Sequence, residues 1–309
     1  MGILSLWAES LTYEYEILKS CTHHKSPRSK CKKCVESCKN KSISFINGIP
    51  YINPEQCTQC GDCISTCTVG AVAGIFPART VKNHQLIITG DQAPATKELL
   101  VYYKRGIEEI VYDGELSEEW RKSIKDTNEI LHLLGEPSLT LINGKVDATT
   151  IEMTRRELFF SWKKEAKTMM VNMAPAKWRF NQDDLQLAKY YPGHQFAEVT
   201  LDASKCTLCR ACEFLCPNNC LNITENSFRI NSQNCSACHL CEDICPEKAL
   251  TVTEKVSEHN PKSISVITKV CIRCAKDFAT MNEGEEDCVP CRKRKELLGQ
   301  GFNNITSSY

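Results

Sequence analysis

Closely spaced cysteines dominate the chemistry that this chain could perform. It has 309 residues, of which 21 are cysteines. Eight of them form two runs of the pattern C-x2-C-x2-C-x3-C-P, and these eight are Cys206, Cys209, Cys212, Cys216, Cys235, Cys238, Cys241 and Cys245. A disulfide framework is typical of small secreted chains, whereas thiols at this short, repeated spacing are typical of metal ligands. The spacing therefore predicts thiolates bound to metal.

The two runs resemble the ligand motifs of bacterial two-cluster 4Fe-4S ferredoxins. In that family the first three cysteines of a run wrap one cluster and the fourth reaches the neighbouring cluster. The resemblance implies that one cluster is held by Cys206, Cys209, Cys212 and Cys245. It implies a second cluster held by Cys235, Cys238, Cys241 and Cys216.

The motif region is repeated earlier in the chain. An offset of 178 positions, that between Cys31 and Cys209, maps seven of the eight cysteines onto cysteines of the first hundred residues: Cys31, Cys34, Cys38, Cys57, Cys60, Cys63 and Cys67. The segments between the runs also align, SISFINGIPYIN with CLNITENSFRIN, and each predicts a short β-hairpin, the first with an Asn47-Gly48 turn. The repeat predicts two ferredoxin modules.

The eighth cysteine of the repeat is displaced. Cys206 aligns with Arg28, and Cys21 lies seven residues before that position. We expect Cys21 to be the missing ligand behind a longer loop, so that the first cluster is held by Cys21, Cys31, Cys34 and Cys67 and the second by Cys57, Cys60, Cys63 and Cys38. The alternative is a three-thiolate site, in which His23 or His24 could stand in.

Four more cysteines lie near the C-terminus. They have the pattern C-x2-C-x13-C-x2-C and are Cys271, Cys274, Cys288 and Cys291. Two such knuckles present four thiolates tetrahedrally, which suits zinc, and the pattern resembles a zinc ribbon. A single rubredoxin-type iron is the alternative. The remaining cysteine, Cys220, aligns with the small residues Ser42, Ala71 and Ala249. We therefore expect Cys220 to pack beside a cluster as a small side chain.

Residues 84–144 alternate between strand and helix patterns. HQLIITG, EEIVYDG and SLTLING are expected strands, and ATKELLVYYKRG and the stretch after Ser117 are expected helices. This βαβαβ order predicts a small parallel sheet. The two glycine-rich patterns that bind phosphate groups, G-x-G-x-x-G and G-x-x-x-x-G-K-[ST], are absent from this segment. We therefore expect a packing or docking domain without a cofactor.

These patterns predict an α+β protein in five parts. They are a first two-cluster module (1–80), the βαβαβ insert (81–150), a helical linker or docking segment (151–200), a second two-cluster module (201–258) and a zinc-ribbon-like tail (259–309). The expected cofactors are four 4Fe-4S clusters and one Zn²⁺. Lysines plus arginines equal aspartates plus glutamates at 38 each, but bound thiolates are deprotonated, so the loaded protein should be acidic.

The pattern of hydropathy and charge limits where the chain could act. No secretory segment and no long apolar stretch is visible, which predicts a cytoplasmic protein that could meet a membrane only through its partners. The basic run RKRK after Cys291 is short and is interpreted as a solvated face, so no nucleic-acid partner is expected.

The expected function is that of an electron-transfer protein with several clusters. Its role resembles that of polyferredoxin subunits, which relay electrons between a catalytic redox subunit and an electron carrier in complexes such as molybdopterin oxidoreductases or hydrogenases. No catalytic site of its own is visible, so whether the chain is itself an enzyme stays open. The alternatives are a stand-alone polyferredoxin, an iron–sulfur and zinc-ribbon redox sensor or regulator, and an enzyme with its site in the insert.

Overall fold

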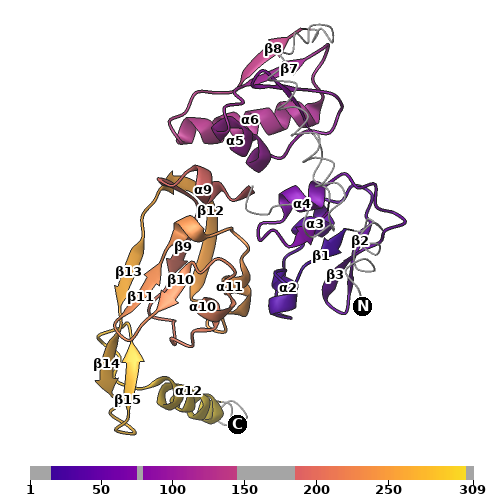
Figure 1. The fold of residues 1–309 in the computed structure, drawn as a ribbon. Coiled ribbons are helices and arrows are strands. Elements are labelled where there is room, and N and C mark those ends of the chain that lie inside the picture. The colour runs from indigo at the N-terminus through magenta and orange to yellow at the C-terminus, as the bar shows by residue number, and fades with distance from the viewer. Residues whose placement is uncertain (1–14, 75–78, 145–184, 304–309) are drawn as a thin grey trace, which may run out of the picture. The chain divides into compact units, whose positions relative to one another are not determined.

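The computed structural model describes residues 15–74, 79–144 and 185–303 of the chain. These residues divide into two units, which are described separately (Figure 1). The first contains Met1–Phe196 together with Val256–Glu258, and the second contains Ala197–Lys255 together with His259–Tyr309. Of the expected segment 151–200, residues 151–184 lie outside the described part of the chain.

The first unit begins with a small module of short elements that surround a compact core. Its strands are β1 (Glu16–Ile17), β2 (Ile43–Ile46), β3 (Ile49–Ile52) and β4 (Val72–Ala73), and its helices are α2 (Thr22–Lys25), α3 (Lys33–Glu36) and α4 (Asp62–Thr66). β1 pairs with β4 and β2 with β3, both antiparallel. The β2–β3 turn has positive φ at both Asn47 and Gly48, as the sequence predicts for a two-residue hairpin turn.

The core of this module packs directly against its cysteines. Ile43, Ile52, Ile64 and Val72 are buried in it. The partly buried cysteines that contact this core are Cys34, Cys38, Cys57 and Cys67. Since the elements are only a few residues long, burial of these apolar side chains positions the loops that carry the thiols.

The second part of the first unit is the α/β insert. It contains β5 (Thr80–Lys82), β6 (Gln85–Ile87), α5 (Thr96–Lys104), β7 (Glu109–Tyr112), α6 (Glu118–Leu133) and β8 (Thr140–Asn143). β6, β7 and β8 pair in parallel, as predicted. β5, which the sequence pattern does not predict, pairs antiparallel with β6 through a turn at Asn83 and His84.

Local sequence signals explain the long helix α6. The Ser117 side chain caps it by accepting a hydrogen bond from the Trp120 backbone N–H. Trp120, Ile124 and Leu131 then share one buried face, and Gly135, with a φ of +72°, follows the end of the helix. The short helix α9 (Leu187–Tyr190) follows later in the chain, and Tyr191 donates a hydrogen bond to the Leu100 carbonyl of α5.

The second unit repeats the first module. Its elements are β9 (His194–Leu201, which begins in the first unit), α10 (Ala211–Leu215), β10 (Leu221–Ile223), β11 (Ser227–Ile230), a 3-10 turn (Ser232–Asn234), α11 (Leu240–Ile244) and β12 (Leu250–Glu258). With the same offset of 178 positions, α10 corresponds to α3, α11 to α4 and β11 to β3. Residues 194–200 form part of strand β9, within the segment for which the sequence predicts a helical linker or a docking segment.

The C-terminal part of the second unit continues the module's sheet. β13 (Lys262–Ser265) pairs antiparallel with β11, so the expected tail begins with a strand of the ferredoxin-like sheet. β14 (Ile267–Val270) and β15 (Asp277–Thr280) then form a separate antiparallel pair, and α12 (Val289–Asn303) ends the described chain. No helix in the described ranges combines the length and apolar character that are needed to cross a bilayer.

Candidate metal centres

Two groups of cysteines in the second module line two separate cavities. One cavity is lined by Cys206, Cys209, Cys212 and Cys245. The other is lined by Cys216, Cys235, Cys238 and Cys241, with Cys220 in the same wall. In each cavity, three cysteines come from one run and the fourth comes from the other run. Each cavity of this module thus combines cysteines from both runs.

The loops that carry these cysteines bend through left-handed residues. Leu208 and Arg210 lie between the cysteines of one run and Ala237 and His239 between those of the other, and all four have positive φ. In the first module, Gln59 and Gly61 do the same between Cys57 and Cys63. Such turns direct successive backbone N–H groups into a concavity that suits an anionic cluster. Leu208, for example, donates its N–H to the Cys206 sulfur at 3.4 Å.

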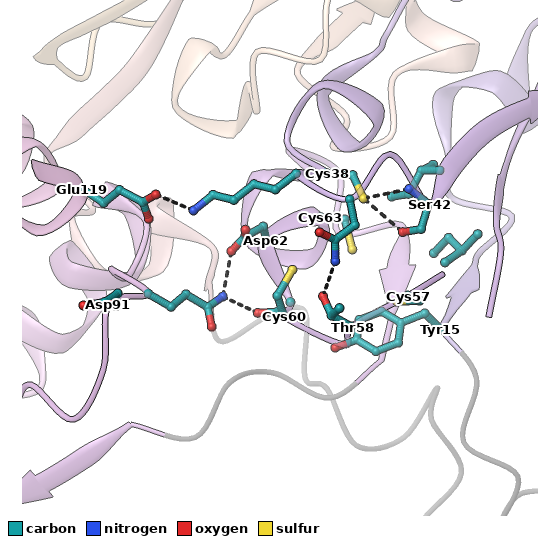
Figure 2. A pocket seen from close by; sticks show the side chains of 16 residues that line it. Tyr15, Cys38, Ser42, Cys57, Thr58, Cys60, Asp62, Cys63, Asp91 and Glu119 are labelled. Carbon is teal, nitrogen blue, oxygen red and sulfur yellow. Dashed lines mark hydrogen bonds and ion pairs between the residues drawn. The ribbon is translucent and has the colours of Figure 1, made fainter. Parts of the chain in front are cut away.

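A cavity in the first module is lined by the equivalent cysteines (Figure 2). Its volume is about 290 Å³, and the cysteines in its wall are Cys38, Cys57, Cys60 and Cys63. Tyr15 forms another part of the wall, and its hydroxyl donates a hydrogen bond to the Gln59 carbonyl at 2.9 Å. The Cys38 sulfur lies 3.0 Å from the Ser42 hydroxyl and accepts the Ser42 N–H at 3.3 Å.

The structure brings the displaced Cys21 to the remaining cysteines of the first module. Burial, together with the charges of three further thiols, Cys67, Cys31 and Cys21, raises the pKa of the Cys34 thiol to about 12. Cys21 is itself 8% exposed, and burial raises its pKa. Cys21 thus lies close enough to interact electrostatically with the three cysteines that the sequence assigns to the same cluster.

The loop after Cys21 is folded by its own hydrogen bonds. Residues 22–25 form α2, and the Ser29 hydroxyl donates to the Thr22 hydroxyl at 2.8 Å in a buried contact. The His23 ring hydrogen-bonds the Cys31 carbonyl at 2.7 Å. His24 is exposed. The turn before Cys34 also differs from the equivalent turns of the other three runs. Lys32 has a φ of −126°, whereas its counterparts Gly61, Arg210 and His239 are left-handed.

The cysteine groups fit a cationic iron–sulfur core. Burial and then neighbouring thiolates raise the pKa of the Cys212 thiol to about 12 and that of the Cys63 thiol well above its usual range. Four such thiols resist ionisation together unless positive charge lies among them, and metal ligation supplies that charge. The donor set, four sulfurs around one cavity with inward N–H groups, is that of a 4Fe-4S site.

The two cysteine groups of each module are neighbours. The charge of Cys34, assigned to the first cluster, acts on Cys63, assigned to the second. Cys212 acts in the same way on Cys241 in the second module. These two pairs are related by the repeat, so the contact between adjacent sites is a shared feature of both modules.

The α/β insert contacts one of these sites directly, although no sequence pattern indicates this contact. The Gln92 amide donates to Asp62 Oδ1 at 2.8 Å and to the Cys60 carbonyl (Figure 2). Lys39 and Glu119 form an exposed ion pair beside it. The Gln92 carbonyl is held by Arg79 at 2.8 Å, and Arg79 also pairs with the buried Glu98 at 3.0 Å.

A second residue of the insert lies near the first cluster site. Lys97, on α5, is half-buried, and burial lowers the pKa of its amino group while the charge of Cys67 opposes that change. Neither Gln92 nor Lys97 belongs to a recognisable motif, so only the tertiary structure identifies them. Ser42, which contacts the Cys38 sulfur, differs from them because the repeat aligns it with Cys220, so the sequence does mark its position beside a cluster.

The C-terminal cysteines also converge. The sulfurs of Cys271, Cys274, Cys288 and Cys291 lie within 4.8 Å of one another, so this group could hold a metal ion. The Cys288 N–H donates to the Cys271 sulfur at 3.3 Å, which lowers the pKa of the Cys271 thiol. Arg273 and Asp287 form an ion pair that joins the two knuckles.

Comparisons with known proteins agree with the two cysteine-rich modules. Residues 28–71 match the family of 4Fe-4S dicluster domains, and residues 199–222 match the family of 4Fe-4S binding domains. The chain therefore contains two ferredoxin-type 4Fe-4S domains. No curated protein matches the chain in a search of their sequences. The ferredoxin-type domains bind iron–sulfur clusters, and the loops, cavities and N–H donors described above are the parts of each domain that would hold them.

Proposed function

We propose that the chain is a four-cluster electron-transfer protein that relays electrons between a catalytic redox subunit and a second carrier. The observation that carries the proposal is the pair of adjacent cysteine groups in each ferredoxin-type domain, which line two cavities in the second domain and one in the first. Bound 4Fe-4S clusters supply reversible one-electron chemistry. The chain's own contribution is to hold two such groups side by side in each domain, among cysteines that are mostly partly buried.

The proposed ligands are four sets of four cysteines. The first domain would use Cys21, Cys31, Cys34 and Cys67 for one cluster and Cys38, Cys57, Cys60 and Cys63 for the other. The second domain would use Cys206, Cys209, Cys212 and Cys245 for one and Cys216, Cys235, Cys238 and Cys241 for the other. For the C-terminal group we propose zinc, because a closed four-thiolate site is typical of structural zinc.

A basic surface beside the first cluster supports the proposed partner chemistry. Arg28, Lys30 and Lys32 are exposed on and beside the loop that precedes Cys31. Exposed positive charge accelerates association with an acidic redox partner, and the effect weakens as salt rises. We propose this loop as the docking face for an acidic electron carrier.

The decisive experiment is anaerobic purification from the native host, with identification of the chains that co-purify. A relay subunit should co-purify with a larger redox protein that carries molybdenum, nickel or flavin, and its clusters should survive repeated reduction and reoxidation. A chain that purifies alone and loses iron in the first oxidation cycle would instead behave as a sensor. That result would contradict the relay.

A further inference from the structure

We propose that Ser42 and Cys220 are positioning residues that raise the reduction potential of one cluster in each ferredoxin-type domain by donating a side-chain hydrogen bond to a ligand sulfur. The inference rests on the proposed loading of both domains with two clusters each. It assigns a difference between neighbouring clusters to two side chains that are not ligands.

The starting point is one backbone contact that recurs at all four sites. Four residues after the last cysteine of each run, a backbone N–H donates to that cysteine's sulfur. The four contacts are Ser42 to Cys38 at 3.3 Å, Ala71 to Cys67 at 3.1 Å, Cys220 to Cys216 at 3.3 Å and Ala249 to Cys245 at 3.3 Å. This backbone donor is therefore common to every site and cannot distinguish one cluster from another.

The side chains at these four positions do distinguish the sites. All four residues are buried, between 1% and 4% exposed. Ala71 and Ala249 have no polar side-chain atom, whereas Ser42 and Cys220 each have a donor. Because Ser42 and Cys220 are related by the repeat, as are Ala71 and Ala249, the donor serves the same member of the cluster pair in both domains.

The Ser42 hydroxyl contacts the sulfur of a proposed ligand. Its oxygen lies 3.0 Å from the Cys38 sulfur, inside the cavity that Cys57, Cys60 and Cys63 also line (Figure 2). A thiolate bound to iron carries no proton, so in the loaded protein the hydroxyl must be the donor and Cys38 the acceptor. The Cys38 sulfur thus receives two hydrogen bonds from one residue.

Cys220 occupies the equivalent position beside a different ligand. It lies in the wall of the cavity formed by Cys216, Cys235, Cys238 and Cys241, and its interaction with the Cys235 thiol raises the pKa of the Cys220 thiol. Its backbone N–H donates to the Cys216 sulfur, so this one residue lies beside two proposed ligands of the same cluster. A thiol is a weaker donor than a hydroxyl, so we expect Cys220 to have the smaller effect of the two.

The direction of the effect follows from charge. Reduction adds one negative charge to a cluster, and hydrogen bonds to its sulfurs stabilise the more negative state. Ser42 therefore raises the potential of the cluster that Cys38 ligates, and Cys220 raises that of the cluster that Cys216 and Cys235 ligate. In each domain, the side-chain donor biases the electron toward that cluster.

The test compares the full chain with variants at these positions after anaerobic loading, by potentiometry followed by electron paramagnetic resonance. Ser42→Ala should shift one of four midpoint potentials downward, with a decrease of roughly threefold to tenfold in the equilibrium constant for reduction. Cys220→Ala should shift a different midpoint downward by less. Iron content should be unchanged in both variants, at about sixteen cluster atoms per chain.

Two further variants separate hydrogen bonding from packing. Cys220→Ser keeps a buried donor and should not lower the midpoint, whereas a purely packing role would shift it as Cys220→Ala does. Ala249→Ser adds a hydroxyl at the position that lacks one and should raise the midpoint of the cluster ligated by Cys245.

The outcomes that overturn the inference differ from those that overturn the proposed function. Unchanged midpoints in Ser42→Ala, with full iron content, would show that the hydroxyl has no effect. Loss of about four iron atoms in Cys220→Ala would show that Cys220 is a ligand rather than a positioning residue. A wild-type chain that loads only one domain would contradict four-cluster loading, and with it the inference for the empty domain.

Discussion

The Gln92 side-chain amide of the α/β insert lies 2.8 Å from Asp62 Oδ1, at the start of the helix that follows Cys60. The same amide donates to the Cys60 carbonyl, so one glutamine connects the insert with a cluster loop of the first domain. Arg79 fixes the backbone at Gln92 and pairs with the buried Glu98. The insert is thus a structural part of one proposed cluster site.

Gln92→Ala should loosen that site without removing a ligand. Two hydrogen bonds of about 1 kcal/mol each would be lost, so the loop that carries Cys60 should open more often. We expect faster release of iron to a chelator from one of the four clusters, and faster amide exchange in α4. Gln85→Ala is the matched control, because Gln85 hydrogen-bonds Glu109 within the insert's own sheet. Equal release rates for both variants would contradict the proposed contact.

Lys97 should favour the reduced state of the cluster assigned to Cys21, Cys31, Cys34 and Cys67. Its half-buried amino group interacts with Cys67, and a nearby positive charge stabilises a more negative cluster. Lys97→Met should lower that cluster's potential by the equivalent of about 1 kcal/mol. Lys104→Met serves as the control on the same helix, because Lys104 pairs with Glu136. Potentiometry in which the two variants shift alike would argue against a specific effect of Lys97.

Cys21→Ser decides the ligand set of the first cluster. Cys21 is buried beside Cys31 and Cys67, so we expect the variant to lose or convert one cluster and keep the other three. Iron and acid-labile sulfide assays and the reduced resonance spectrum measure this. Cys220→Ser is a matched control, since it also replaces a buried cysteine, and it should keep all its iron. If Cys21→Ser keeps its full iron and an unchanged spectrum, Cys21 is not a ligand.

The C-terminal cysteine group should contain one zinc ion per chain. Its sulfurs converge within 4.8 Å, and removal of a structural zinc leaves such a small hairpin without a core. Cys288→Ala should therefore lose the zinc and speed amide exchange in β14 and β15, while the iron content stays constant. Elemental analysis measures the metal. A wild-type chain with an additional iron and a rubredoxin-type visible spectrum would replace zinc by iron at this site.

Glu213 should stabilise the second domain in a pH-dependent way. Its carboxylate accepts the Ile223 N–H at 2.8 Å and pairs with Arg210, and the Arg210 contact lowers its pKa from 4.5. A lowered folded-state pKa means stability that is present above about pH 4.5 and is lost as the pH falls through the folded value. Glu213→Gln should cost about 1 kcal/mol at pH 7 and less in acid.

Denaturant midpoints for cluster bleaching, measured at several pH values, test the prediction for Glu213. Glu225→Gln, in the exposed β10–β11 turn, is the control and should leave the midpoint unchanged at every pH. A difference between wild type and Glu213→Gln that stays constant from pH 7 into acid would show that ionisation of Glu213 is not the cause.

Local spacing was enough to predict much of the fold and most of the cysteine groups. The repeat at an offset of 178 positions predicted two equivalent modules because identical ligand spacing demands identical loops. Hydrophobic periodicity and capping residues predicted α6 and its boundaries, including the Ser117 cap. β5 was missed because its three residues, Thr80–Lys82, carry too little pattern, and its pairing with β6 is decided by a turn at two left-handed residues.

The positions of the cysteines in the chain identify the atoms that could bind metal, but folding selects which of those atoms come together. Cysteine identity and spacing set the chemistry, because a motif is local. Proximity between Cys21 and Cys67, or between Gln92 and Asp62, depends on how the loops and the insert pack. The separation of these residues along the sequence does not indicate whether they meet in the folded chain. Burial likewise converts Ser42 from an ordinary small residue into a hydrogen-bond donor at a sulfur, because only the folded chain excludes the water that would otherwise compete for it.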